Sequence, residues 1–219
     1  MTTDSPIPVL AWFDRHFSVR LPVTRFALNT VVLSLLALAP VLGLYIAMVP
    51  GFWPHLIAAD AALARFFRQI LTNGLPVVFV VNALGFVLFA RLRAERLRPG
   101  AVLVIDMVAR IGAFIALHVA IYPASALMFG SFGGDPLQAL GVVGPTLAQA
   151  AAFGNLSGVY LYATLVSAFP LHMALVVAVL DRRGYARRSL AGLAVPALAV
   201  FGLQALLMTG VALLLGLVV

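Results

Sequence analysis

Asp106 and Arg110 interrupt a long apolar run, and their spacing makes them the clearest candidates for chemistry in this chain. Residues four apart share one face of a helix, so a carboxylate and a guanidinium at this spacing can form an ion pair. Each charged side chain in a membrane-inserted segment costs about 2.5–3.5 kcal/mol, so the pair asks for an explanation. Two interpretations remain open. We favour a self-neutralising pair that tightens a bundle over a site that handles an anion or a proton in a polar cavity.

Asn82 and His172 lie in two other apolar runs at a similar depth. Along ideal helices, Arg110 lies about 14 Å from the start of its run, and Asn82 and His172 each lie about 12 Å from one end of theirs. The sequence therefore predicts a candidate midplane polar site made of Asp106, Arg110, Asn82 and His172. It does not indicate whether these side chains face each other, and a single Asn or His in a bundle is more often a helix–helix hydrogen bond than a ligand. Gln204 is interpreted in the same way.

Haem binding would require two histidines at one level. Only His118 and His172 fall within the apolar runs, and on ideal helices they differ in depth by about 12 Å. This offset argues against a shared haem, and we predict no cofactor. The patterns H-E-x-x-H and G-x-x-x-x-G-K are absent from the sequence, so no metal or phosphate site is predicted either.

Two short stretches superficially suggest intramembrane proteases. Residues 154–158 read G-N-L-S-G where the serine motif of rhomboid-like proteases needs G-x-S-G, and residues 133–136 read G-G-D-P without a second membrane aspartate placed opposite. Both stretches are better interpreted as turns. The sequence therefore predicts no catalytic residue and no enzyme.

The composition indicates the environment of these elements. Apolar residues make up 63% of the 219 residues and charged residues 10%, against about 45–50% and about 25% in soluble domains. The chain also has no cysteine, which excludes disulfides, thiolate metal sites and cysteine nucleophiles. We expect an all-α integral membrane protein with the lipid bilayer around it, formed by one membrane domain.

Five runs have the roughly 20 apolar residues that a membrane-spanning helix needs. They are residues 27–49, 74–90, 101–122, 156–180 and 190–217. The second run is short, and we expect it to take up residues of the segment before it. Residues 136–153 are mildly apolar, and whether they are interfacial, re-entrant or spanning stays open.

The arginines predict the orientation, because cytoplasmic loops of membrane proteins carry an excess of positive charge. The chain has no lysine, and with the N-terminus in the cytoplasm the following arginines face inward: Arg15, Arg20, Arg25, Arg91, Arg93, Arg96, Arg98, Arg182, Arg183, Arg187 and Arg188. Only Arg65 and Arg68 then lie outside. This bias predicts a cytoplasmic N-terminus and a C-terminus on the periplasmic or outer side.

One or two amphipathic helices should lie at the membrane interface. Residues 1–26 are expected to form a cytoplasmic interfacial segment, with a helix capped by Ser5 and with Trp12, Phe13 and Phe17 at the headgroups. Residues 27–219 would form the bundle. Between the first two spans, apolar and polar residues alternate at helical spacing from Leu56 to Thr72, which predicts a second helix on the outer surface.

These observations predict a small bacterial inner-membrane protein without enzymatic activity. The first choice is an accessory or structural subunit that binds other membrane subunits, because a transporter of this size often has internal repeats and none is evident. The alternatives are a small-solute or ion transporter that uses the midplane polar site and, last, a haem-bearing anchor or membrane enzyme. Nucleic acid is not expected as a partner, since the arginines lie in short clusters between apolar runs.

Overall fold

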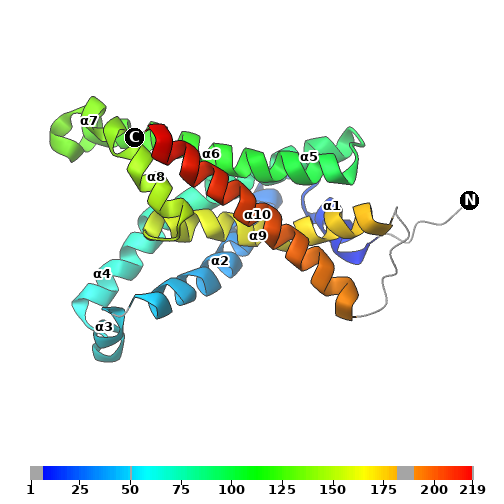
Figure 1. Ribbon diagram of the computed structural model, residues 1–219, viewed down its shortest axis with the longest axis horizontal. Coiled ribbons are helices and arrows are strands. Elements are labelled where there is room, and N and C mark those ends of the chain that lie inside the picture. Colours follow the sequence, from blue (N-terminus) through cyan, green and yellow to red (C-terminus); the bar gives the residue numbers. More distant parts are fainter. Residues whose placement is uncertain (1–6, 50, 182–189, 219) are drawn as a thin grey trace, which may run out of the picture.

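The computed structural model describes residues 7–49, 51–181 and 190–218, and these residues form helices joined by short turns (Figure 1). The helices are α1 (Pro8–His16), α2 (Val23–Met48), α3 (Phe52–Ala58), α4 (Ala61–Gln69), the π-helix η1 (Ile70–Gly74), α5 (Leu75–Ala94), α6 (Pro99–Phe129), the 3-10 helix η2 (Ser131–Gly134), α7 (Pro136–Gly141), α8 (Val143–Ala151), α9 (Leu156–Asp181) and α10 (Leu190–Val218). The all-α architecture expected from the composition is confirmed for this part of the chain.

Five helical segments are long and apolar enough to cross a membrane, which confirms the predicted bundle. They are Val23–Met48, Ala61–Ala94, Pro99–Phe129, Leu156–Leu180 and Ala194–Gly216. The second is a continuous stretch of 34 residues, because α4 continues through η1 into α5. The short second run of the sequence therefore extends toward its N-terminus, as expected.

The amphipathic region between the first two spans differs from the single surface helix that its periodicity predicts. Ala59 adopts a left-handed conformation with φ of 47° and ends α3. Asp60 then starts α4, and its carboxylate accepts hydrogen bonds from the backbone N–H groups of Ala62 and Leu63 at 2.9 and 3.0 Å. This N-cap divides the predicted helix in two, and the second half joins the spanning helix instead of remaining separate from it.

Residues 136–153 form two short helices, α7 and α8, of 6 and 9 residues. At about 1.5 Å per residue these helices are about 9 and 14 Å long, well below the roughly 30 Å of a bilayer core. Helix α8 buries Val143 and Leu147 in the bundle. The segment therefore does not add a sixth long helix to the described structure.

Helix α1 contacts the bundle more closely than an interfacial helix was expected to. Phe13 and Phe17 are buried, and the Phe17 ring stacks on Phe86 of α5 with the ring centroids 4.0 Å apart. Arg93 holds this contact by donating two hydrogen bonds to Asp14, at 2.9 and 2.7 Å. The two phenylalanines thus lie inside the protein and not among lipid headgroups. The predicted cap Ser5 lies outside the described residues.

The long helices run between two ends of the molecule (Figure 1). Helix α1 and the turn between α5 and α6 lie at one end, and α3, α4, α7 and the C-terminal part of α10 lie at the other. Among the described arginines, Arg65 and Arg68 belong to α4, whereas the cluster from Arg91 to Arg98 surrounds the α5–α6 turn. The cluster Arg182–Arg188 lies outside the described residues, and the orientation stays a prediction.

Candidate functional site

The four side chains of the predicted midplane site form one hydrogen-bonded cluster. Arg110 donates from Nε to Oδ2 of Asp106 at 2.7 Å, and its Nη2 lies 3.4 Å from Oδ1 of the same carboxylate. Both residues belong to α6, and the spacing of four residues brings the guanidinium onto the carboxylate. The fork of the guanidinium matches the two carboxylate oxygens, which is the strongest geometry for such a pair.

Asn82 connects this ion pair to two further helices. Its Oδ1 accepts a hydrogen bond from Arg110 Nη1 at 2.8 Å and another from the Ser167 hydroxyl of α9 at 2.6 Å. Its Nδ2 donates to Ser34 Oγ of α2 at 2.9 Å. These three partners fix the orientation of the amide and join α2, α5, α6 and α9 at one point.

His172 of α9 completes the cluster from the other side of the carboxylate. Its Nε2 donates to Asp106 Oδ2 at 2.7 Å, so this oxygen accepts from both His172 and Arg110. With a neutral imidazole, the net charge of the cluster is zero. The Nδ1 atom of His172 is buried and has no hydrogen-bond partner among the described residues. An unmet buried acceptor of this kind costs about 1–3 kcal/mol.

Two neighbours on α5 shape the space around the guanidinium. Gly85 lies so close to Arg110 that a Cβ atom at this position would overlap the guanidinium. On the next residue, the ring of Phe86 lies under the guanidinium, with Cζ 4.4 Å from the ring centroid, which permits a cation–π interaction. The sequence did not predict a role for Gly85, Phe86, Ser34 or Ser167. Gly85 follows Asn82 by three residues on one helix face, and this spacing was the available signal.

The cluster is closed to solvent. Asn82, Asp106, Arg110 and His172 each have a relative exposure of 0%. Polar groups at such a position are stable when they satisfy one another, since a buried charge without a partner costs several kcal/mol. In this conformation the cluster is suited to holding helices together, and no solute can reach it without a rearrangement.

The remaining predicted polar residues lie elsewhere. His118 has Nδ1 at 2.9 Å from the carbonyl oxygen of Phe114 and Nε2 at 3.3 Å from Ser157 Oγ, so it does not share a partner with His172. Gln204 of α10 is buried, and its Nε2 has no hydrogen-bond partner among the described residues. Among these residues no group of three or more His, Asp and Glu side chains is arranged to hold a metal ion.

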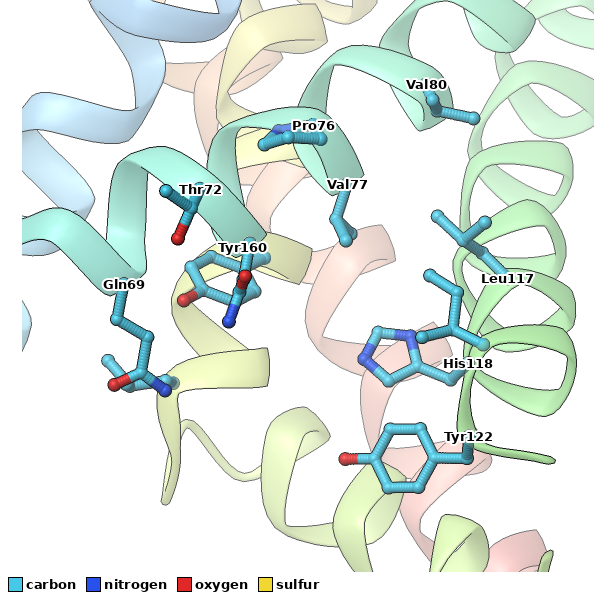
Figure 2. A pocket seen from close by; sticks show the side chains of 12 residues that line it. Gln69, Thr72, Pro76, Val77, Val80, Leu117, His118, Tyr122 and Tyr160 are labelled. Carbon is cyan, nitrogen blue, oxygen red and sulfur yellow. The ribbon is translucent and has the colours of Figure 1, made fainter. Parts of the chain in front are cut away.

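A pocket of about 480 Å³ lies between α5 and α6, and His118 is one of its lining residues (Figure 2). Its wall consists of Gln69, Thr72, Asn73, Pro76, Val77, Val80, Leu117, His118, Ile121, Tyr122, Leu156 and Tyr160. In Figure 2 the rings of His118 and Tyr122 project from α6 toward the opposing helix, and Tyr160 of α9 lies on the opposite side, near Thr72 and Gln69. None of the four residues of the polar cluster lines this pocket.

The fold and the closed cluster together define an all-α, multi-span membrane bundle. No protein-family model, curated protein or solved structure matches the chain.

Proposed function

We propose that this protein is a non-enzymatic accessory or structural subunit of a membrane complex in a bacterial inner membrane. The observation that carries the proposal is the complete burial of the ion pair between Asp106 and Arg110. A site that binds or transports an ion needs charged groups that the ion can reach. In this bundle, the two charged side chains instead form hydrogen bonds with each other and with Asn82 and His172.

The cluster explains how a very apolar bundle keeps a defined arrangement. Apolar side chains give little specificity in a membrane, because lipid tails solvate them as well as neighbouring helices do. Asn82 donates a hydrogen bond to Ser34 and accepts one each from Ser167 and Arg110, and these bonds set the rotation of four helices about their axes. A rigid scaffold of this kind is suited to presenting a surface to other subunits.

Helix α10 is the element that supports a role in assembly. Only 17% of its most apolar window is buried within the chain, compared with 56% for α9. Its exposed side chains include Leu198, Phe201, Leu206 and Leu213. We propose that this face contacts another membrane subunit, while the remaining exposed apolar surface contacts lipid.

A site-specific photocrosslinking experiment in native membranes tests this proposal. A photoreactive phenylalanine analogue replaces Leu206 on α10, which is 68% exposed, and, as a control, Leu84 on α5, which is 55% exposed. We expect a discrete protein adduct from position 206 and none from position 84. Lipid adducts alone at both positions, with a single uncomplexed species in mild detergent, would contradict an accessory role.

Ion transport is the second candidate, and the convergence of Asp106, Arg110, Asn82 and His172 from three helices favours it. It requires another conformation in which the cluster meets water. Proton flux into proteoliposomes, followed with an entrapped pH-sensitive dye, tests it directly. A transporter should lose its flux in the Arg110→Ala variant while still inserting, and an unchanged rate in that variant would remove this candidate.

A further inference from the structure

We propose that the pocket between α5 and α6 binds a neutral lipid-like molecule with a hydroxyl-bearing head, of the diacylglycerol class. No residue of the polar cluster and no residue of α10 lines this pocket. Its volume of about 480 Å³ falls within the roughly 300–1,000 Å³ of small-molecule sites. Its wall combines a largely apolar lining with a few convergent polar groups, which is also typical of such sites.

The absence of charged side chains in the lining indicates which ligands the pocket can bind. None of the residues that line the pocket is an Asp, Glu, Lys or Arg. A phosphate or an ammonium group would enter a largely apolar site within the bundle and lose its hydration without gaining a counter-ion, which is costly. The lining therefore favours a neutral ligand over a charged phospholipid.

The polarity of the pocket changes along its length, and this gradient sets the ligand's orientation. Val80 and Leu117 lie toward the α5–α6 turn, where the two helices converge. Gln69, Thr72 and Tyr122 lie at the opposite, wider end (Figure 2). A molecule with one polar and one apolar part matches this arrangement, with its head at the wider end and its apolar part among the valines and leucines.

The hydrogen-bonding groups favour a hydroxyl in the head. A carbonyl oxygen only accepts, so the contact with Phe114 requires the proton of His118 on Nδ1. A neutral His118 then presents Nε2 as an acceptor, and its bond to Ser157 is long at 3.3 Å. A ligand hydroxyl can replace Ser157 as the donor to this nitrogen. Tyr122 and Tyr160 also line the pocket, and a tyrosine hydroxyl can donate to an ester carbonyl group.

One wall of the pocket includes an irregular helical segment. Residues Ile70–Gly74 form a π-helix, a feature that occurs frequently at functional sites. The absence of a side chain at Gly74 lets Tyr160 approach closely, since a Cβ atom there would overlap the tyrosine ring. This contact holds Tyr160 in the wall of the pocket.

Native mass spectrometry of the purified full chain tests the proposal with three probes that carry the same acyl chains. They are 1,2-dioctanoylglycerol, its 3-O-methyl ether and dioctanoyl phosphatidic acid. Loss of the single hydrogen bond from the hydroxyl should weaken binding of the ether about threefold to tenfold. The phosphate-bearing probe should bind more weakly still. Equal binding of all three probes would overturn the proposal, because it would reduce the pocket to a nonspecific groove.

Variants of the pocket lining test whether the ligand binds there and distinguish a loss of binding from a loss of folding. His118→Phe keeps a ring but removes the acceptor, so dioctanoylglycerol should bind this variant no better than the ether does. Tyr122→Phe removes only a hydroxyl and should weaken binding severalfold even if the first variant proves unstable. The control is Val119→Ala, next to His118 on an exposed part of α6 and outside the pocket lining, which should leave binding unchanged. Wild-type affinity in both pocket variants would contradict the assignment.

Discussion

Gly85 and Arg110 are complementary in shape: the guanidinium occupies the space that a side chain on Gly85 would fill. A Cβ atom at position 85 would overlap Arg110 Cζ and would lie 2.7 Å from Nη2 and 2.8 Å from Nε. The guanidinium has little freedom to move away, because Asp106, Asn82 and the Phe86 ring hold it on its other sides. The ion pair between Asp106 and Arg110 on α6 therefore requires a glycine at position 85 of α5.

The first prediction is that Gly85→Ala destabilises the bundle. The added methyl group displaces Arg110 and lengthens its hydrogen bonds, so we expect a lower midpoint of unfolding in detergent. Gly112→Ala is the matched control, since it lies on α6 with no atom within 4 Å of an added Cβ. That control should be neutral or slightly stabilising. Equal midpoints for the two variants would contradict the proposed packing.

The second prediction concerns the ion pair itself. Arg110→Ala leaves the Asp106 carboxylate buried without its counter-ion and should cost about 3–5 kcal/mol of unfolding free energy. The double variant Asp106→Leu/Arg110→Met removes both charges and should recover part of this loss. Equilibrium unfolding in mixed micelles measures both values. A double variant that is less stable than Arg110→Ala would show that the charges contribute more than mutual neutralisation.

Sequence and structure agree where the signal is local. Apolar runs predict the long helices, and the spacing of Asp106 and Arg110 predicts their contact, because both depend only on helix geometry. The contacts of Asn82 with Ser34 and Ser167 join residues 48 and 85 positions apart. They depend on how each helix is rotated about its axis. A helix that is apolar all round carries no sequence pattern that reveals this rotation.

The N-terminal segment shows a second limit of sequence patterns. Phe13 and Phe17 have the composition expected at a lipid interface, but a protein interior accepts the same side chains. The salt bridge between Asp14 and Arg93, 79 residues apart, decides between the two locations. No periodicity in either segment indicates that pairing.

The third prediction follows from this location of α1. Phe17→Ala removes a fully buried ring that stacks on Phe86, and large-to-small changes of this kind cost about 3–5 kcal/mol. Val9→Ala, on an exposed part of α1, serves as the control and should change stability little. Thermal unfolding monitored by tryptophan fluorescence distinguishes the two. An unchanged unfolding midpoint in Phe17→Ala would contradict this packing and would indicate that α1 lies at the membrane interface.

The fourth prediction is a pH dependence at the start of α4. The hydrogen bond from His55 at 2.6 Å, together with the backbone N–H groups of Leu63 and Ala62, lowers the pKa of Asp60 below its ordinary value of 3.8. The cap is therefore complete above pH 3.8 and is lost as the pH falls through the lowered pKa. Hydrogen-exchange protection of the Ala62 and Leu63 amides should fall in that acidic range.

The substitution Asp60→Asn provides the control for this pH effect. An asparagine side chain can still accept at the N-cap but has no carboxyl group to titrate. Protection of the two amides should then stay constant over the same range of pH. A parallel loss of protection in the wild type and in this variant would assign the effect to another group.

The closed state of the polar cluster can be measured directly, because the natural chain has no cysteine. Ser167→Cys places a thiol beside Asn82, and Thr72→Cys places one in the exposed wall of the α5–α6 pocket. In native membranes treated with a water-soluble thiol reagent, we predict that position 72 is labelled and position 167 is not. Labelling of position 167 at a rate comparable to that of position 72 would contradict a closed cluster and support a transport pathway through it.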